Sequence, residues 1–190
     1  MTDIFLYESV LDYIKDDEAY KTGSQWGESR NGHPEGSVSS HIKELEQNLE
    51  KLCDTKNISD LEKYKLLILI NVHDTFKIHA RPKVAITNIY SHASLAKDFL
   101  SRYLDDKDLL NMVQYHDENY ALYKKHKKSG QVDKERLEKL FKEIKDWRLF
   151  MIFIIIDNCT KGKGRSPLKW FMYKVKEKFD IDVDETWILE

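Results

Sequence analysis

The stretch "SDLEKYKLLILINVHD", residues 59–74, decides the fold. It opens on Ser59, whose hydroxyl is of the kind that caps helix N-termini, and its charged half gives way to an apolar run before His73. The length and continuity of the pattern favour a helix over a strand. Because the apolar half leaves almost no polar face, we expect this helix at the centre of the molecule.

Helical periodicity continues on both sides of this stretch. In residues 37–53 the apolar side chains recur three or four positions apart, behind Ser37 as a plausible N-cap. No alternating strand pattern and no internal repeat is visible. The sequence therefore predicts an all-α fold. Besides 59–74, we expect helices over residues 3–15, 37–53, 89–104, 106–115, 117–128, 133–158 and 167–179, with loops over 21–36 and 77–88.

Composition supports the same conclusion. The chain has 190 residues, 41% of them hydrophobic and 34% charged, with only 7 Gly and 3 Pro. That profile is typical of a helix-rich globular protein, and the length suits one domain.

The first twenty residues carry acids where a secretory signal would carry basic residues. The longest apolar run, "LFMIFIII" (149–156), is far shorter than the ~20 residues of a membrane span. Two cysteines, Cys53 and Cys159, are too few for a disulfide framework. We therefore expect a cytoplasmic protein with reduced thiols, with no membrane, haem or flavin partner.

Metal-binding side chains stand where the most apolar predicted segments end. His73 and Asp74 directly follow residues 66–72, and Asp157 directly follows residues 149–156. A helix buried that deeply ends at the core, so its last residues emerge in a protected place. A carboxylate there is costly unless a cation or a hydrogen-bond donor neutralises it.

His41 adds a third helix, because it lies on the apolar side of residues 37–53. A lone histidine on an apolar face is more often a core residue than a ligand. Three buried helices that each deliver a metal-competent side chain nevertheless predict a metal site. The candidate ligands are His33, His41, His73, Asp74, His92, His116, Asp117 and Asp157.

The order of these residues resembles the signature of the HD-domain metal-dependent phosphohydrolase superfamily. "HPEGSVSSH" (33–41) is similar to the entry motif of the HD domain appended to bacterial tRNA nucleotidyltransferases, and "HDTFK" (73–77) to the family's HD-x-G-K motif. "YSHASLAKDFL" (90–100) and "MVQYHDENY" (112–120) resemble the segments that supply further histidines.

The resemblance covers residues 31–165, which implies a single HD domain with an N-terminal helix and loop (1–30) and a C-terminal helix and tail (166–190). The resemblance does not extend to the nucleotidyltransferase domain itself, so it does not imply tRNA end synthesis. The expected architecture is a helical HD-type bundle with the metal between central helices.

The resemblance also implies roles for the candidate residues. His41, His73, Asp74 and Asp157 would hold one divalent cation, and Asp74 would also take a proton from its bound water. His92 and His116, with Asp117, would extend the site toward a second metal or the substrate phosphate. Glu35 and His33 would line the entrance or orient a ligand. Lys77, with Lys161 and Arg165, would neutralise charge on the phosphate.

Three residues depart from the family pattern. Phe76 replaces the glycine of HD-x-G-K and is expected to narrow the site or shift Lys77. Ala93 stands where a Glu often follows the third histidine. Asp117 stands where two-metal branches often carry a second adjacent histidine, which argues against two metals.

A ligand set of imidazole and carboxylate without thiolate suits Mn, Ni, Co, Mg or Fe better than structural zinc. The expected substrate is a phosphorylated small molecule, a nucleotide or cyclic nucleotide, or an RNA-end phosphate, with Tyr115, Tyr120, Tyr123 and Trp170 available for stacking on a base.

Two alternatives stay open. One is a catalytically idle scaffold that binds a nucleotide or partner protein, and the other is an RNA-binding accessory protein that uses the basic segment 161–178.

Overall fold

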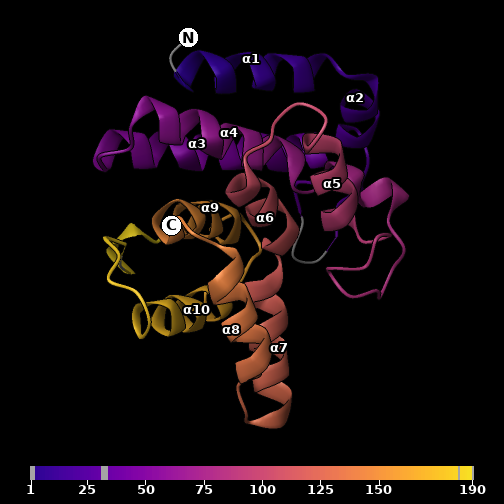
Figure 1. Ribbon diagram of the computed structural model, residues 1–190. Helices are drawn as coiled ribbons and strands as arrows, with labels where there is room; N and C mark the ends of the chain where they lie inside the picture. The colour runs from indigo at the N-terminus through magenta and orange to yellow at the C-terminus, as the bar shows by residue number, and fades with distance from the viewer. Residues whose placement is uncertain (1–2, 31–33, 184, 190) are drawn as a thin grey trace.

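The computed structural model describes residues 3–30, 34–183 and 185–189 of the chain (Figure 1). As the sequence predicts, it is built from helices, and the described residues contain no β-strand. None of the described helices is both long and apolar enough to cross a membrane. The helices are α1 Asp3–Asp16, α2 Glu18–Ser24, α3 Val38–Thr55, α4 Asp60–Val72, α5 His92–Leu100, α6 Lys107–Tyr115, α7 Glu118–Ser129, α8 Lys134–Glu143, α9 Trp147–Asn158 and α10 Ser166–Lys176, with 3₁₀ turns η1 Thr75–His79 and η2 Glu185–Trp187.

Helix α4 lies at the centre, as expected. Ser59 and Glu62 form a capping box at its start, where each side chain accepts a hydrogen bond from the other residue's backbone. Its apolar half is buried apart from the half-buried Leu67, and the helix contacts α1, α3, α6 and α9 (Figure 1). Helix α9 is the second buried element, since every residue from Leu149 to Asn158 is buried. These two helices fix the positions of the residues that follow their last turns.

The single helix expected over residues 133–158 is wrong, because the chain breaks there into α8 and α9. Ile144 adopts an extended conformation, and Asp146 caps α9 by accepting a hydrogen bond from the Leu149 amide. The Asp108 carboxylate of α6 accepts the backbone N–H groups of Lys145 and Asp146, at 2.7 and 2.8 Å. A side chain from another element thus satisfies the donors that a continuous helix would use.

Two smaller expectations also need correction. The loop expected from residue 21 begins later, because Asp17 caps the short helix α2 by accepting the Ala19 amide. The helix expected over 59–74 ends at Val72, so His73 and Asp74 lie in the turn that leads into η1. That turn directs the two side chains into the interior, where both are buried.

Candidate metal centre

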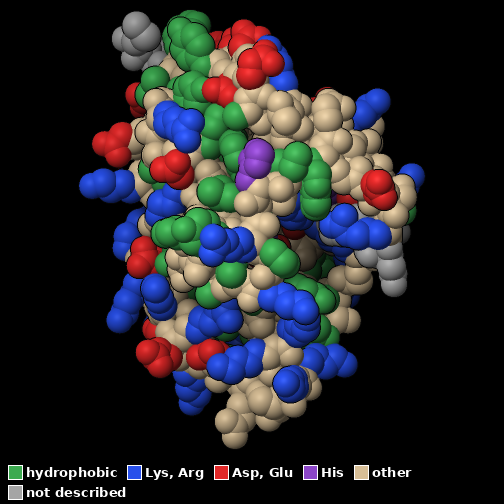
Figure 2. Space-filling model, turned by 90° about the vertical axis from the view of Figure 1, so that its right-hand side faces the viewer, with side chains coloured by type: hydrophobic (Ala, Val, Ile, Leu, Met, Phe, Trp, Pro, Cys, Tyr) green, Lys and Arg blue, Asp and Glu red, His purple; other side chains and the backbone are tan. Residues whose placement is uncertain are grey.

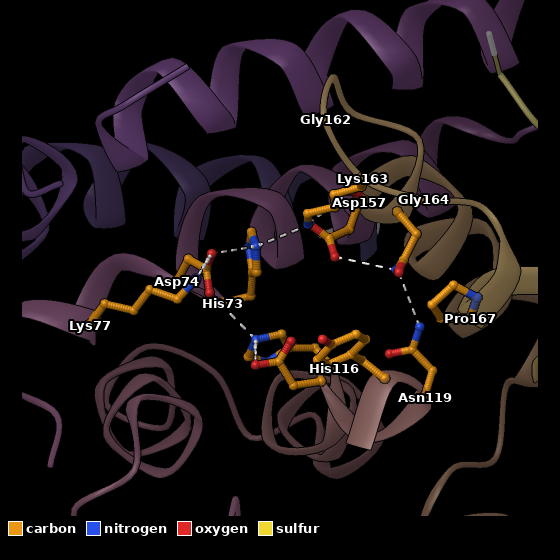
Figure 3. A pocket seen from close by; sticks show the side chains of 13 residues that line it. His73, Asp74, Lys77, His116, Asn119, Asp157, Gly162, Lys163, Gly164 and Pro167 are labelled. Carbon is orange, nitrogen blue, oxygen red and sulfur yellow. Dashed lines mark hydrogen bonds and ion pairs between the residues drawn. The ribbon is translucent and has the colours of Figure 1, made fainter. Parts of the chain in front are cut away.

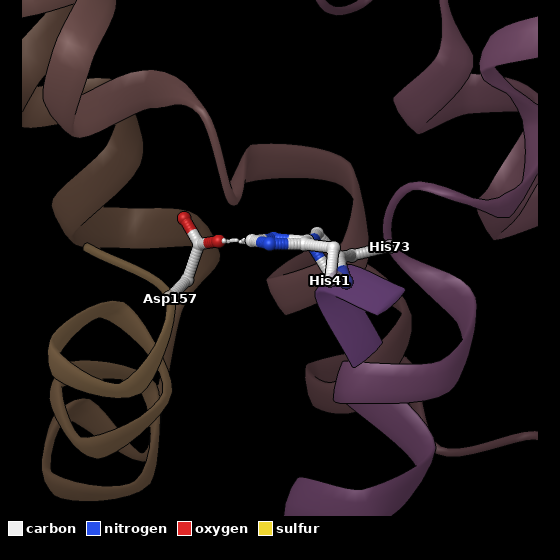
Figure 4. A group of neighbouring side chains, drawn as sticks. All are labelled: His41, His73 and Asp157. Atoms are coloured by element: carbon white, nitrogen blue, oxygen red, sulfur yellow. Dashed lines mark hydrogen bonds and ion pairs between the residues drawn. The ribbon is translucent and has the colours of Figure 1, made fainter. Parts of the chain in front are cut away.

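Five elements deliver histidines and carboxylates to one region. His41 comes from the first turn of α3, Asp157 from the last turn of α9, and His73 and Asp74 from the turn after α4 (Figures 3 and 4). His92 begins α5 and His116 follows α6. These residues, far apart in the sequence, form two neighbouring clusters.

The first cluster contains His41, His73 and Asp157, each buried and each offering a ligand atom within 4.8 Å of the others. The Asp157 carboxylate faces both rings from one side, with its Oδ1 3.0 Å from Nε2 of His41 and 3.8 Å from Nε2 of His73 (Figure 4). Behind His41, Glu35 Oε1 lies 3.1 Å from the other ring nitrogen. Glu35 therefore orients His41, whereas His33 lies outside the described residues.

The second cluster contains Asp74, His92 and His116. The Nε2 atoms of the two histidines lie 3.1 Å apart, and Asp74 Oδ1 lies 3.5 Å from Nε2 of His116 and 3.8 Å from that of His92. The expected grouping of Asp74 with the first cluster is therefore incomplete. Its Oδ2 lies 3.5 Å from Nε2 of His73, so Asp74 stands between the clusters.

The hydrogen bonds of His73 and His116 determine which nitrogen faces the centre. Nδ1 of His73 lies 3.0 Å from the Ile70 carbonyl, and Nδ1 of His116 lies 2.8 Å from the Val113 carbonyl. A carbonyl only accepts, so each Nδ1 carries a proton. In His73 the neutral ring then presents the lone pair of Nε2 to the carboxylates, whereas in His116 burial is outweighed by Asp117 and Asp74, which raise the pKa of the ring. Such an arrangement of lone pairs and carboxylate oxygens suits a cation, and a backbone-anchored Nδ1 is the usual support of a metal-bound histidine.

Charge in the centre is strongly organised. Burial lowers the pKa of His73 to about 3, so this ring is neutral. Burial opposes ionisation of Asp157, but Lys163 and His41 outweigh it and hold its pKa well below the usual range. The pKa of Asp74 is likewise low, because the charge of Lys77 and the hydrogen bond from His116 outweigh its burial. The centre therefore holds two ionised carboxylates beside a neutral imidazole.

Two lysines reach these carboxylates from opposite sides. Lys77 Nζ lies 2.5 Å from Asp74 Oδ2, and Lys163 Nζ lies 2.7 Å from Asp157 Oδ1 (Figure 3). Phe76 packs on Phe99, with ring centroids 4.8 Å apart, so it leaves Lys77 at the site.

The two cations expected beyond Asp157 lie elsewhere. Lys161 is exposed, and Arg165 donates hydrogen bonds to the carbonyls of Asn158, Cys159 and Leu189. Arg165 thus ties the C-terminal segment to the end of α9. Lys163, which the sequence analysis did not select, takes the place beside the carboxylate because the glycine-flanked loop turns its side chain inward.

An open cavity of about 540 Å³ gives access to the centre, and we call it the site cavity (Figure 3). His73, Asp74 and Asp157 are at its wall together with both lysines. Asp117, whose side chain is 49% exposed, also faces it. Of the four aromatic residues considered for base stacking, Tyr120 lines the cavity, whereas Tyr115 is buried and Tyr123 packs against Trp170. Asn119 and Asn158 also line the cavity, and neither was among the predicted site residues.

Comparison with known proteins identifies no relative: no family model, no curated protein and no solved structure matches this chain.

Proposed function

We propose that this protein is a metal-dependent phosphohydrolase of the HD type, with its metal between the ends of the central helices. The substrate would be a nucleotide, a cyclic nucleotide or an RNA-end phosphate. One observation carries the proposal: the Nε2 lone pair of a neutral, buried His73 faces the ionised carboxylates of Asp74 and Asp157. The resemblance in motif order supports it independently.

His41, His73 and Asp157 would hold the cation, with Asp74 at the border of this cluster. Asp74, His92 and His116 are the candidates for a second cation or for contact with the phosphate. A bound Mn, Ni, Co, Mg or Fe ion would lower the pKa of a bound water and polarise a phosphoryl oxygen. The donor set of imidazole nitrogen and carboxylate oxygen fits that group of ions.

Hydrolysis forms a bond between a water oxygen and phosphorus and breaks the ester P–O bond, so a proton must leave the water. Asp74 is ionised and lines the site cavity, which makes it the acceptor we assign. Lys77 and Lys163 stand at the same wall, where their charges would offset the negative charge of the phosphate in the transition state.

The test combines elemental analysis with activity assays. Purified wild type, Asp74→Asn and Asp98→Asn would be assayed on p-nitrophenyl phosphate, its bis-ester and 2′,3′-cyclic nucleotides, with each metal and with EDTA. Asp98 is the matched control, because it is 73% exposed and pairs with Arg102 on the outer side of α5.

We expect bound metal and turnover in the wild type and in the control, with kcat/KM at least ~100-fold lower in Asp74→Asn. A wild type that is metal-free and inactive on the whole panel would refute the enzyme and favour the idle scaffold.

A further inference from the structure

A second cavity of about 690 Å³ adjoins the site cavity, and we call it the side cavity. The two cavities share Lys77, Asp117 and Tyr120 in their walls, and His92 also lines the side cavity. Its outer wall is formed by residues 80–86 of the loop between η1 and α5. A substrate with its scissile phosphate at the candidate metal centre can therefore extend into this space.

The cations around the side cavity differ in how far they are neutralised. Lys77 pairs with Asp74, and Arg136 donates through Nε and Nη2 to the two carboxylate oxygens of Glu118. Arg81 and Lys83 are exposed and have no carboxylate partner among the described residues. Asp117, the carboxylate in this wall, is turned toward His92, with its Oδ2 3.3 Å from the ring Nε2. Figure 2 looks onto this side of the molecule and shows Lys and Arg side chains bordering a hollow.

Arg81 is held in place by Tyr90. Its guanidinium carbon lies 3.7 Å from the centroid of the Tyr90 ring, and its backbone N–H donates to the Tyr90 carbonyl at 2.9 Å. A guanidinium that lies over a ring keeps the N–H donors at its edge available for an anion. The stacking therefore fixes a cation at the mouth of the side cavity without neutralising its charge.

The rest of the loop is anchored as well. The Ile86 carbonyl accepts hydrogen bonds from three side chains of α5 and α6 or their caps, namely Ser91 Oγ at 2.5 Å, Ser94 Oγ at 3.2 Å and Gln114 Nε2 at 2.6 Å. Lys83 has a positive φ of 62°, a backbone conformation that residues other than glycine and asparagine rarely adopt. A loop held in this way presents Arg81 and Lys83 in a preorganised position.

We propose that Arg81 and Lys83 bind a second phosphate of the substrate. The substrate is then a phosphate ester whose leaving portion carries another phosphate, rather than a simple monoester. This inference rests on the proposed function for the position of the scissile phosphate. A nucleoside bisphosphate and the phosphorylated end of an oligonucleotide share this chemistry, and the experiment separates them.

Phosphate release would be measured from adenosine 5′-monophosphate, adenosine 3′,5′-bisphosphate and the 5′-phosphorylated dinucleotide pApA. We expect the wild type to favour at least one substrate with a second phosphate by ~10-fold or more in kcat/KM. Preference for the dinucleotide alone would indicate an oligonucleotide end, and preference for both would indicate the second phosphate itself.

The double variant Arg81→Gln/Lys83→Asn should remove this preference and change kcat/KM for the monophosphate by less than ~2-fold. Asparagine is chosen at position 83 because it tolerates the positive φ. Arg102→Gln is the control, an arginine on α5's C-terminal side that pairs with Asp98 and lines neither cavity. Equal losses on all three substrates, or no preference in the wild type, would overturn the inference.

If the wild type hydrolyses none of these compounds nor p-nitrophenyl phosphate, the proposed function fails on its own. Calorimetric binding of the same three nucleotides then decides the inference. A preference of at least ~10-fold for a second phosphate that the double variant loses would support Arg81 and Lys83 as an anion site. Equal affinity for the three nucleotides would exclude it.

Discussion

Lys161 and Lys163 stand two residues apart in the loop after α9, but their surroundings differ. Lys163 Nζ lies 2.7 Å from the Asp157 carboxylate and 3.1 Å from its carbonyl oxygen, whereas Lys161 is exposed. If the proposed hydrolysis takes place at this centre, Lys163→Ala should lower kcat/KM for p-nitrophenyl phosphate by roughly 10-fold or more, because a cation next to the proposed phosphate position is lost. Lys161→Ala should change it less than about 2-fold. Similar losses of kcat/KM in both variants would mean that the loop contributes its net positive charge and not a specific contact of Lys163.

At this scale the sequence predicts some residues and not others. His73, Asp74 and Asp157 could be selected because each follows an apolar run that has to end in the interior. The division of the ligands into two clusters depends on side-chain rotation and on the meeting of five elements, which no local pattern records. Lys163 could not be preferred over Lys161, since the inward turn of the loop has no periodic signal.

At the scale of elements, the contact between α2 and η1 holds the turn that carries Asp74 and Lys77. A Cβ at Gly23 would lie 2.2 Å from the Thr75 carbonyl oxygen and 2.8 Å from its Cγ2. Gly23→Ala should therefore displace η1, lower the free energy of unfolding by about 1–3 kcal/mol and reduce activity. Urea denaturation measures the first effect.

Gly164→Ala is its control, because a Cβ there would meet nothing within 4 Å. Its free energy of unfolding should stay within about 0.5 kcal/mol of the wild type. A free energy of unfolding that is equally unchanged in Gly23→Ala would contradict the close packing of α2 on η1.

Asp106 joins the three helices α1, α4 and α6. It caps α6, accepts a hydrogen bond from Tyr7 of α1 at 2.7 Å, and lies 3.1 Å from the Lys65 ammonium of α4. Burial opposes its ionisation, but the hydrogen bonds from Tyr7 and from the Leu109 amide, with the Lys65 charge, outweigh it and lower its pKa. We expect Asp106→Asn to cost about 1–2 kcal/mol at neutral pH.

The pH dependence follows from the direction of that shift. A folded-state pKa below the unfolded one means that the stabilisation is present above the unfolded pKa of about 4, and is lost as the pH falls through the folded pKa. The difference in unfolding free energy between wild type and Asp106→Asn should therefore shrink in acid. A difference that stays constant down to the acid transition would show that the charge of Asp106 contributes nothing.

The elements themselves were largely predictable, because caps and apolar periodicity are local properties. Ser59 and Ser37 mark the starts of α4 and α3 as expected. The break between α8 and α9 was not predictable, since the amides of residues 145 and 146 are bound by Asp108, which lies some forty positions earlier. A continuous periodic pattern cannot reveal a partner that distant.

On the scale of the whole molecule, the candidate metal centre places ionised carboxylates in the most deeply buried part of the fold. The ends of α4 and α9, the two helices with the most completely buried residues, carry the carboxylates of Asp74 and Asp157. Burying ionised groups costs free energy unless partners compensate, and here Lys77, Lys163 and His41 supply only part of the coordination that these oxygens can accept. A cation bound there would stabilise the folded chain as a whole, because the unfolded chain cannot assemble the cluster.

We therefore expect the melting temperature of the protein to depend on metal. At a free metal concentration of 100 Kd, binding adds about 2.7 kcal/mol to the free energy of unfolding. For a chain of this size that corresponds to roughly 5–10 °C in Tm, reversible by EDTA. Asp157→Asn removes the carboxylate that faces His41 and His73 and should abolish the shift, whereas Asp98→Asn should keep it. Differential scanning fluorimetry with Mn, Ni, Co, Mg and Fe provides the measurement. An equal shift in Tm for Asp157→Asn would place the cation outside the His41–His73–Asp157 cluster. No shift in Tm with any of the five metal ions would contradict the metal site, because the buried carboxylates would then be neutralised by bound protons and by the two lysines alone.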